Sequence, residues 1–309
     1  MSQKGPTLKN CVWDILKSAD EETLKEMLAI SELGKKYLDI RDEKYKEEKR
    51  NLHSMLNFNT TKPIKYDLIK TIIENMNEAM TEGMGIVDKF RNMDKYPKQL
   101  QECVKALTLA LERKAKDLKD EEWKRSLRKI REEYKNIELT CEQSIKLEEI
   151  IVDLLLDAYL RTMPKNDREN IVKQIIANLQ KYASMENIDL SKVNVGYILT
   201  HGGLIALRQA LGFKFHILTA IVINSIWNYT GALLAGSGLS LAVNAIIQRV
   251  VATVLGPLGW IIVIISTLAL VSKLLNPREY DKYIPLVVYI YILRHNIHKT
   301  IETLKDLPE

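Results

Sequence analysis

Residues Phe215–Ser272 read FHILTAIVINSIWNYTGALLAGSGLSLAVNAIIQRVVATVLGPLGWIIVIISTLALVS, and this stretch contains one formal charge, Arg249, between Lys214 and Lys273. The residues before Phe215 hold 73 of the 85 Asp, Glu, Lys and Arg side chains. A nearly uncharged run of this length either enters a bilayer or is enclosed by protein. We therefore expect a charged, water-facing body joined to an apolar region that avoids water.

The balance of charge limits the partners that this chain can have. It has 309 residues with 45 basic and 40 acidic side chains, a net charge of +5. Nucleic-acid binding needs a clustered basic face, whereas the segment Leu118–Lys135 mixes both signs as solvated helix faces do. We therefore expect no nucleic-acid partner, and a mild positive charge that suits anionic lipid.

Sequence motifs of catalysis and cofactor binding do not occur in this chain. It has no GxxxxGK[ST], HExxH or GxSxG, and the GSG at Gly236–Gly238 lacks the strand and the third glycine of a dinucleotide site. The carboxylates of the N-terminal half lie in mixed-charge helical segments, where we expect them on solvated faces. The sequence thus indicates a non-enzymatic protein without a cofactor.

Three cysteines, Cys11, Cys103 and Cys141, are odd in number and far apart, so the sequence offers neither a disulfide framework nor a zinc motif. This usage fits a reducing cytoplasm. The N-terminus MSQKGPTLKN has no apolar segment of the secretory kind. We therefore expect a cytoplasmic protein that would meet a membrane from its inner side.

Helix signals dominate the charged part of the chain, and we expect an all-α fold. Ser18 followed by Glu21 has the spacing of a capping box, which predicts a helix through Leu28. Further helices are expected over Ser31–Leu56, Ile64–Asn92, Leu100–Leu111, Glu121–Tyr134, Cys141–Thr162 and, capped by Asn166 with Glu169, through Tyr182. Strand signals are limited to weak candidates near Val193–Leu199.

Two features of these helices bear on packing. Leu100–Leu111 and Glu121–Tyr134 are expected to form an antiparallel pair joined near Leu118–Asp120. The segment Cys141–Thr162 is apolar nearly all round at its centre, so we expect it to be buried.

Glycine pairs divide the apolar region. The pair Gly202–Gly203 predicts a tight turn, while AGSG at Ala235–Gly238 and GPLG at Gly256–Gly259 separate three predicted helices. These helices are expected over Phe215 to about Leu234, Leu239 to about Leu255, and Leu258–Leu275, and a last helix over Tyr283–Leu304. The predicted domains are a charged one, residues 1–185, and an apolar one, residues 186–309, with a hydrophobic hairpin at about 215–275.

Insertion of this hairpin into a bilayer is energetically marginal. A spanning helix needs about 20 apolar residues, which Phe215–Leu234 supplies. Its aliphatic and Phe side chains contribute roughly −3 to −5 kcal/mol on an insertion scale, and Asn224, Ser225 and Asn228 offset much of that. Arg249 at mid-bilayer costs about 2.5–3.5 kcal/mol. A hairpin buried at rest and inserted on a trigger fits these values better than a constitutive span.

Polar residues of the hairpin form two amide pairs. Asn224 and Asn228 are four residues apart, as are Asn244 and Gln248, so each pair lies on one helix face. Such faces either hydrogen-bond between helices in a membrane or form a polar seam in a soluble core. The hairpin residues singled out are Asn224, Asn228, Gly231, Gly236, Gly238, Asn244, Gln248, Arg249, Gly256, Pro257, Gly259 and Trp260, with Gly231, Gly236 and Gly238 at the tip. Lys214, Trp227 and Lys273 are the expected interface anchors.

A metal site is the weakest candidate that the sequence offers. His295, His298 and Glu302 share a predicted helix face and could supply two or three ligands. The competing interpretation is that these residues are surface side chains at a basic helix end. No metal is expected.

The C-terminal third also carries the motifs GPLGW at Gly256–Trp260 and YDKYIPLVVYIYILR at Tyr280–Arg294. Together with ILKSADEETLKEML at Ile15–Leu28 and LLLDAYLRTMPKNDREN at Leu154–Asn170, these motifs resemble those of the bacterial YaaW-like proteins, a family sometimes grouped with ubiquinol–cytochrome c chaperone-like proteins. Where that family places an Arg just after the Tyr, this chain has Asp281. The resemblance implies a mostly helical bacterial cytoplasmic protein with an assembly or membrane-adjacent role.

Two functions follow as expectations. In the first, the hairpin inserts into or perturbs the bacterial inner membrane in a pore-forming manner, and the N-terminal domain restrains it. Its partner is then a lipid bilayer or a membrane protein, with a homo-oligomer left open. In the second, the protein is a soluble chaperone or assembly factor whose apolar helices form its core or a client groove.

Overall fold

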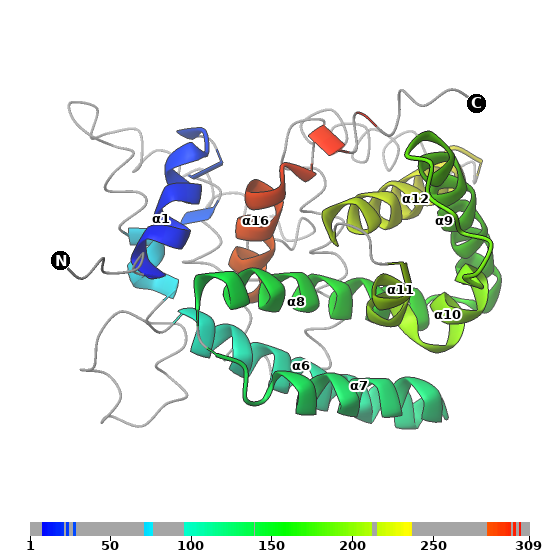
Figure 1. Ribbon diagram of the computed structural model, residues 1–309, viewed down its shortest axis with the longest axis horizontal. Coiled ribbons are helices and arrows are strands. Elements are labelled where there is room, and N and C mark those ends of the chain that lie inside the picture. The colour runs from blue at the N-terminus through cyan, green and yellow to red at the C-terminus, as the bar shows by residue number, and fades with distance from the viewer. Residues whose placement is uncertain are drawn as a thin grey trace. The chain divides into compact units, whose positions relative to one another are not determined.

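The computed structural model describes residues 8–21, 23–24, 27–28, 71–76, 96–138, 140–211, 215–236, 283–297, 299–300 and 303. Every regular element in these ranges is an α-helix and none is a strand, which confirms the all-α prediction (Figure 1). The chain divides into two compact units. One comprises Met1–Leu107, Glu133–Ile151 and Leu268–Arg294, and the other Thr108–Glu132, Val152–Thr267 and His295–Glu309.

The first unit is built around buried helix faces. It contains α1 (Leu8–Ser18), the first half of α6 (Tyr96–Asp117), the first half of α8 (Cys141–Thr162) and most of α16 (Tyr283–His295). In α16 every residue from Tyr283 to Ile292 is buried, so this apolar helix is a core element of the unit. The bounds of α8 coincide with those predicted, and its predicted burial is confirmed over most of its length.

The start of the chain differs from the prediction. Ser18 ends α1, where its hydroxyl donates to the carbonyl oxygen of Ile15 at 2.6 Å. The carboxylate of Asp20 instead accepts from the backbone N–H of Thr23 at 2.7 Å and from its hydroxyl at 2.9 Å. The capping role predicted for Ser18 was therefore wrong, because Asp20 is an equally good capping residue two positions later.

Two further details of the first unit depart from the sequence analysis. Helix α6 begins at Tyr96, ahead of the predicted Leu100, with Pro97 in its first turn, where the missing N–H of proline has no helical partner to lose. Cys141 is disulfide-bonded, although cysteine spacing gave no sign of a disulfide, and Cys103 is a buried free thiol. Burial raises the pKa of the Cys103 thiol well above its usual value.

The second unit contains the other helices. These are the second halves of α6 and α8 together with α7 (Glu121–Tyr134), α9 (Lys165–Met185), α10 (Val195–His201), α11 (Gly203–Leu211) and α12 (Phe215–Gly236). The predicted antiparallel pairing of α6 with α7 is confirmed. Arg131 Nη1 of α7 lies 2.5 Å from Glu112 Oε1 of α6, and Asp120 caps α7 by accepting from Trp123 N at 3.0 Å.

The starts of helices α9 and α10 differ from the predictions. Helix α9 starts at Lys165, and its N-cap residue is Pro164, whose side chain has no polar atom to accept a hydrogen bond. The N-cap is therefore not Asn166, as its spacing with Glu169 predicted. The weak strand candidate at 193–199 is helical from Val195, because the side chain of Asn194 accepts from the backbone N–H of Tyr197 and caps α10.

The last helix is shorter than predicted. Helix α16 ends at His295, and Asn296 follows with a positive φ of 46°. Helical residues resume at Ile297, so the chain bends within the predicted Tyr283–Leu304 helix. An asparagine tolerates this left-handed conformation better than most residues, which explains the position of the break.

Candidate functional site

Helix α12, the first segment of the apolar region, lies beside α9 in the second unit (Figure 1). From Leu218 to Ile226 all of its side chains are buried. Helices packed on all sides normally carry few polar groups, yet this stretch includes Thr219, Asn224 and Ser225. The candidate site is the face through which these polar residues hold α12 to the charged helices.

Polar contacts at Ser225 and Tyr229 join α12 to α9. The side chain of Asn178 donates to the hydroxyl of the buried Ser225 at 3.0 Å, and Ser225 donates to the carbonyl of Ile221 at 2.8 Å. One turn further, the Tyr229 hydroxyl donates to Asp167 Oδ1 at 2.7 Å. Ser225 and Tyr229 are four residues apart, so both contacts lie on the same face of α12.

A buried ion pair makes a further contact, with α11 and α8. Arg208 of α11 forms an ion pair with Asp153 of α8, and the two side chains are only 2% and 1% exposed. The same guanidinium nitrogen donates to Thr219 Oγ1 of α12 at 2.8 Å. Burial raises the pKa of Asp153 to about 6, against the opposing effect of Arg208. Arg208 thus links α8 to α12 through one side chain.

The junction between α10 and α11 is held by Arg161, which is 3% exposed. Its three nitrogens donate to Asp120 Oδ2 at 2.6 Å, Asp157 Oδ2 at 3.2 Å and the His201 carbonyl at 3.2 Å. Its guanidinium also lies 4.9 Å from the ring centre of Trp123, within cation–π range. This cluster fixes the predicted tight turn at Gly202–Gly203, a prediction that the structure confirms.

In the first unit, Glu148 holds α16. The Arg294 guanidinium donates to both Glu148 oxygens, at 2.8 and 2.9 Å, and the Tyr96 hydroxyl donates to Oε1 at 2.8 Å. Burial raises the pKa of Glu148 even with these donors present. Tyr283, at the start of α16, donates to Gln99 Oε1 at 3.0 Å. The segment that follows the apolar region is therefore also held by charged and polar groups.

The structure places some of the predicted hairpin residues. Asn224 is buried and Asn228 is exposed, while Gly231 and Gly236 both belong to α12, which runs two residues past its predicted end at Leu234. Trp227 also lies within this helix. Ten further hairpin and anchor residues lie outside the described part of the chain: Lys214, Gly238, Asn244, Gln248, Arg249, Gly256, Pro257, Gly259, Trp260 and Lys273.

The weak metal candidates are not brought together as a set. His295 stacks on His216 of α12, with ring centres 5.5 Å apart and an angle of 13° between the planes. His298 and Glu302 lie outside the described residues. Within the described ranges, no group of three or more His, Cys, Asp and Glu side chains is arranged to hold a metal ion.

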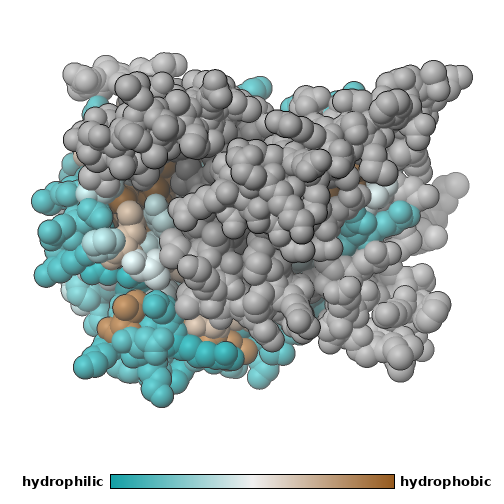
Figure 2. All heavy atoms as spheres, turned by 180° about the vertical axis from the view of Figure 1, so that it is seen from behind, coloured by the Kyte–Doolittle hydropathy of each residue, from teal (hydrophilic) through white to brown (hydrophobic). Residues whose placement is uncertain are grey.

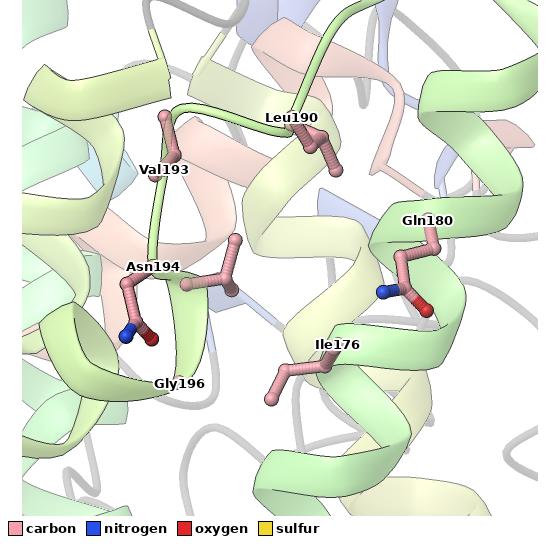
Figure 3. A pocket seen from close by; sticks show the side chains of 7 residues that line it. Ile176, Gln180, Leu190, Val193, Asn194 and Gly196 are labelled. Carbon is pink, nitrogen blue, oxygen red and sulfur yellow. The ribbon is translucent and has the colours of Figure 1, made fainter.

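A small pocket lies between α9 and the loop before α10. Its volume is about 280 Å³, slightly below the usual range of ligand sites, about 300–1,000 Å³. Figure 3 shows Ile176 and Gln180 projecting from α9 toward the loop that carries Val193 and Asn194. The Asn194 side chain is already engaged as the cap of α10, so the pocket offers few free polar groups.

The described surface is mostly polar. On the face shown in Figure 2, hydrophobic described residues form small separate patches among hydrophilic ones. The large exposed apolar side chains in the described ranges are Leu109, Leu118, Met185 and Tyr197. Isolated residues of this kind are normal on protein surfaces. Of the helices that the structure describes, none combines the length and the apolar character that crossing a membrane requires.

Sequence reasoning missed the residues that hold α12 and α10–α11. Carboxylates of the N-terminal half were expected on solvated faces, but Glu148 and Asp153 are buried. This expectation was wrong because each of them has an arginine partner far away in sequence, Arg294 and Arg208. One signal was available: Asp153, Asp157 and Arg161 are spaced four apart inside an apolar run, the pattern of a buried polar stripe.

Comparison with protein-family models, with curated proteins and with solved structures finds no match to this chain.

Proposed function

We propose that this protein is a non-enzymatic, membrane-acting helical protein of the bacterial cytoplasm. Its C-terminal hydrophobic hairpin, at about 215–275, inserts into or perturbs the inner membrane. The charged helices restrain that hairpin until a trigger acts. The observation that carries the proposal is the set of polar contacts on α12: Thr219 with Arg208, Ser225 with Asn178, and Tyr229 with Asp167.

These contacts matter because apolar burial stabilises α12 about equally when it is docked on the charged helices and when it is inserted in lipid. Lipid tails are about as apolar as a leucine-rich core, so Leu218, Ile221 and Ile223 gain similarly from either environment. The polar side chains differ, since they have partners in the docked state and lose them in lipid. A neutral hydrogen bond contributes about 0.5–1.5 kcal/mol, and one to a charged group about 1.5–3 kcal/mol.

The restraint on α12 is therefore of the order of a few kcal/mol, a size that binding of a ligand or partner can overcome. The insertion energy of this segment taken alone is marginal. The proposal accordingly assigns insertion to the hairpin as a unit, with α12 as the segment that the charged helices hold.

Fractionation with carbonate extraction, together with dye release from phosphatidylethanolamine–phosphatidylglycerol vesicles, tests this function. The variant Ala232→Asp/Leu234→Asp places two charges in the hairpin and should abolish vesicle binding and dye release. Its control is Ala177→Asp/Leu118→Asp, with the same two substitutions at exposed positions of α9 and the α6–α7 turn. Unchanged membrane binding of the hairpin variant, with the helical content of both preserved, would contradict the proposal.

The alternative function is a soluble chaperone or assembly factor. The observation that favours it is the complete burial of α16 from Tyr283 to Ile292, which makes an apolar segment part of an ordinary core. This reading predicts a monomer or dimer that stays in solution without detergent. It also predicts no binding to vesicles at any pH between about 5 and 8, so the same vesicle experiment separates the two functions.

A further inference from the structure

Asn224 is the one buried polar residue of α12 whose side-chain oxygen has no partner in the described part of the chain. It is 5% exposed, and its Oδ1 accepts no hydrogen bond there. Its neighbours Thr219 and Ser225 both have partners on other helices. A buried amide oxygen without a donor is unfavourable. The contacts of α12 in the folded protein therefore do not explain why this position is an asparagine.

Asn224 does not belong to the face that meets α9. Ser225 and Tyr229 point to α9, and each is one residue further along the helix than Asn224 and Asn228. One residue corresponds to a rotation of about 100° around an α-helix. Asn228, one turn after Asn224 on the same face, is exposed. The two amides therefore form a stripe separate from the restraining contacts.

We propose that Asn224 and Asn228 form the contact through which α12 helices from two or more copies of this chain associate in the membrane. The inference rests on the proposed function. An amide side chain carries both donor and acceptor, so a pair of identical stripes can exchange hydrogen bonds across a symmetry axis. In lipid, where water cannot satisfy them, such amides hydrogen-bond between helices. The oxygen that lacks a partner in the docked helix gains one in the oligomer.

The test separates association from insertion. The full-length protein is added to phosphatidylethanolamine–phosphatidylglycerol vesicles, and two quantities are measured: the fraction that resists carbonate, and the fraction captured as dimers or larger species by an amine-reactive crosslinker. The variant is Asn224→Leu/Asn228→Leu. Its control, Asn136→Leu/Asn166→Leu, makes the same change at two exposed asparagines outside α12.

The Asn224→Leu/Asn228→Leu protein should resist carbonate at least as well as the unmodified protein, because leucine is the more apolar residue. Its crosslinked fraction should fall about tenfold, while the control keeps both values. Crosslinking at the unmodified level in this variant would overturn the inference and leave the proposed function standing. An unmodified protein that never resists carbonate would overturn both. Asn228→Leu alone, at an exposed position, repeats the test if the double variant does not fold.

Discussion

Gly203 packs directly against the carboxylate of Asp157. Its φ is +79°, and a Cβ at this position would lie 2.7 Å from Asp157 Oδ2 and 2.8 Å from Oδ1. Glycine adopts this left-handed conformation without steric cost, and only a residue without a side chain fits so near the carboxylate. Asp157 in turn accepts from Arg161, so the α10–α11 junction and the buried charges of α8 depend on one another.

Replacing Gly203 with alanine should therefore destabilise the protein clearly. A positive φ at a non-glycine residue costs about 1–3 kcal/mol, and the displaced Asp157 adds to that loss. The control is Gly196→Ala, where φ is not positive and the nearest atom is the flexible end of Ile176 at 3.3 Å. Urea unfolding should show a change within about 0.5 kcal/mol for the control. Equal effects of the two variants would contradict this account.

Arg161→Met should destabilise the second unit strongly. It leaves Asp157 buried and Asp120 partly buried without their cation, and breaking a buried pair from one side costs about 3–5 kcal/mol. Lys165→Met is the matched control, because Lys165 is 79% exposed and lies 3.9 Å from Glu169. That pair should contribute at most about 0.5 kcal/mol. A loss below about 1 kcal/mol on thermal or urea unfolding of Arg161→Met would rule out the central role of Arg161.

The pKa of Asp153 predicts how stability changes with pH. Folding raises this pKa from its ordinary value of 3.8 to about 6; burial is the largest cause, Arg208 opposes it, and Asp157 adds to it. The folded state therefore takes up a proton more readily than the unfolded state between these values. The contribution of this group to stability is full below about pH 4 and is lost as the pH rises through 6.

Between pH 7.5 and pH 5 the unmodified protein should gain about 1 kcal/mol more stability than Asp153→Asn does. Asp117→Asn, an exposed carboxylate of α6, serves as the control and should keep the slope of the unmodified protein. Identical slopes for Asp153→Asn and the unmodified protein would contradict the assignment.

Local signals in the sequence predicted the helices well. The apolar pattern of Cys141–Thr162, followed by Pro164, fixed both ends of α8, because proline disfavours helix in the residue before it. The loss of charge at Phe215 marked the start of α12. Where two capping residues competed, as with Ser18 and Asp20, spacing alone did not decide between them.

The buried charges were not predictable in the same way. Periodicity reports which face of a helix is apolar, but the burial of Asp153 depends on Arg208, which lies 55 residues away in sequence. The same holds for Glu148 and Arg294, 146 residues apart. Without an ion-pair partner, a buried carboxylate is too costly, so tertiary pairing decides whether such a residue is inside or outside. The polar face that joins α12 to α9 and α11 could be found only from the folded structure.

The last prediction tests the proposed restraint of α12 through the contact between Asn178 and Ser225. Asn178→Ala removes the donor to a buried hydroxyl and should weaken the docking of α12 by about 1–2 kcal/mol. If docking and insertion compete, the fraction of protein bound to phosphatidylglycerol-containing vesicles should rise about five- to thirtyfold while it is small. Asn166→Ala, at an exposed position of the same helix, should leave binding unchanged. A fall in thermal stability without any gain in vesicle binding would show that α12 is a core helix and not a restrained one, and would favour the soluble alternative.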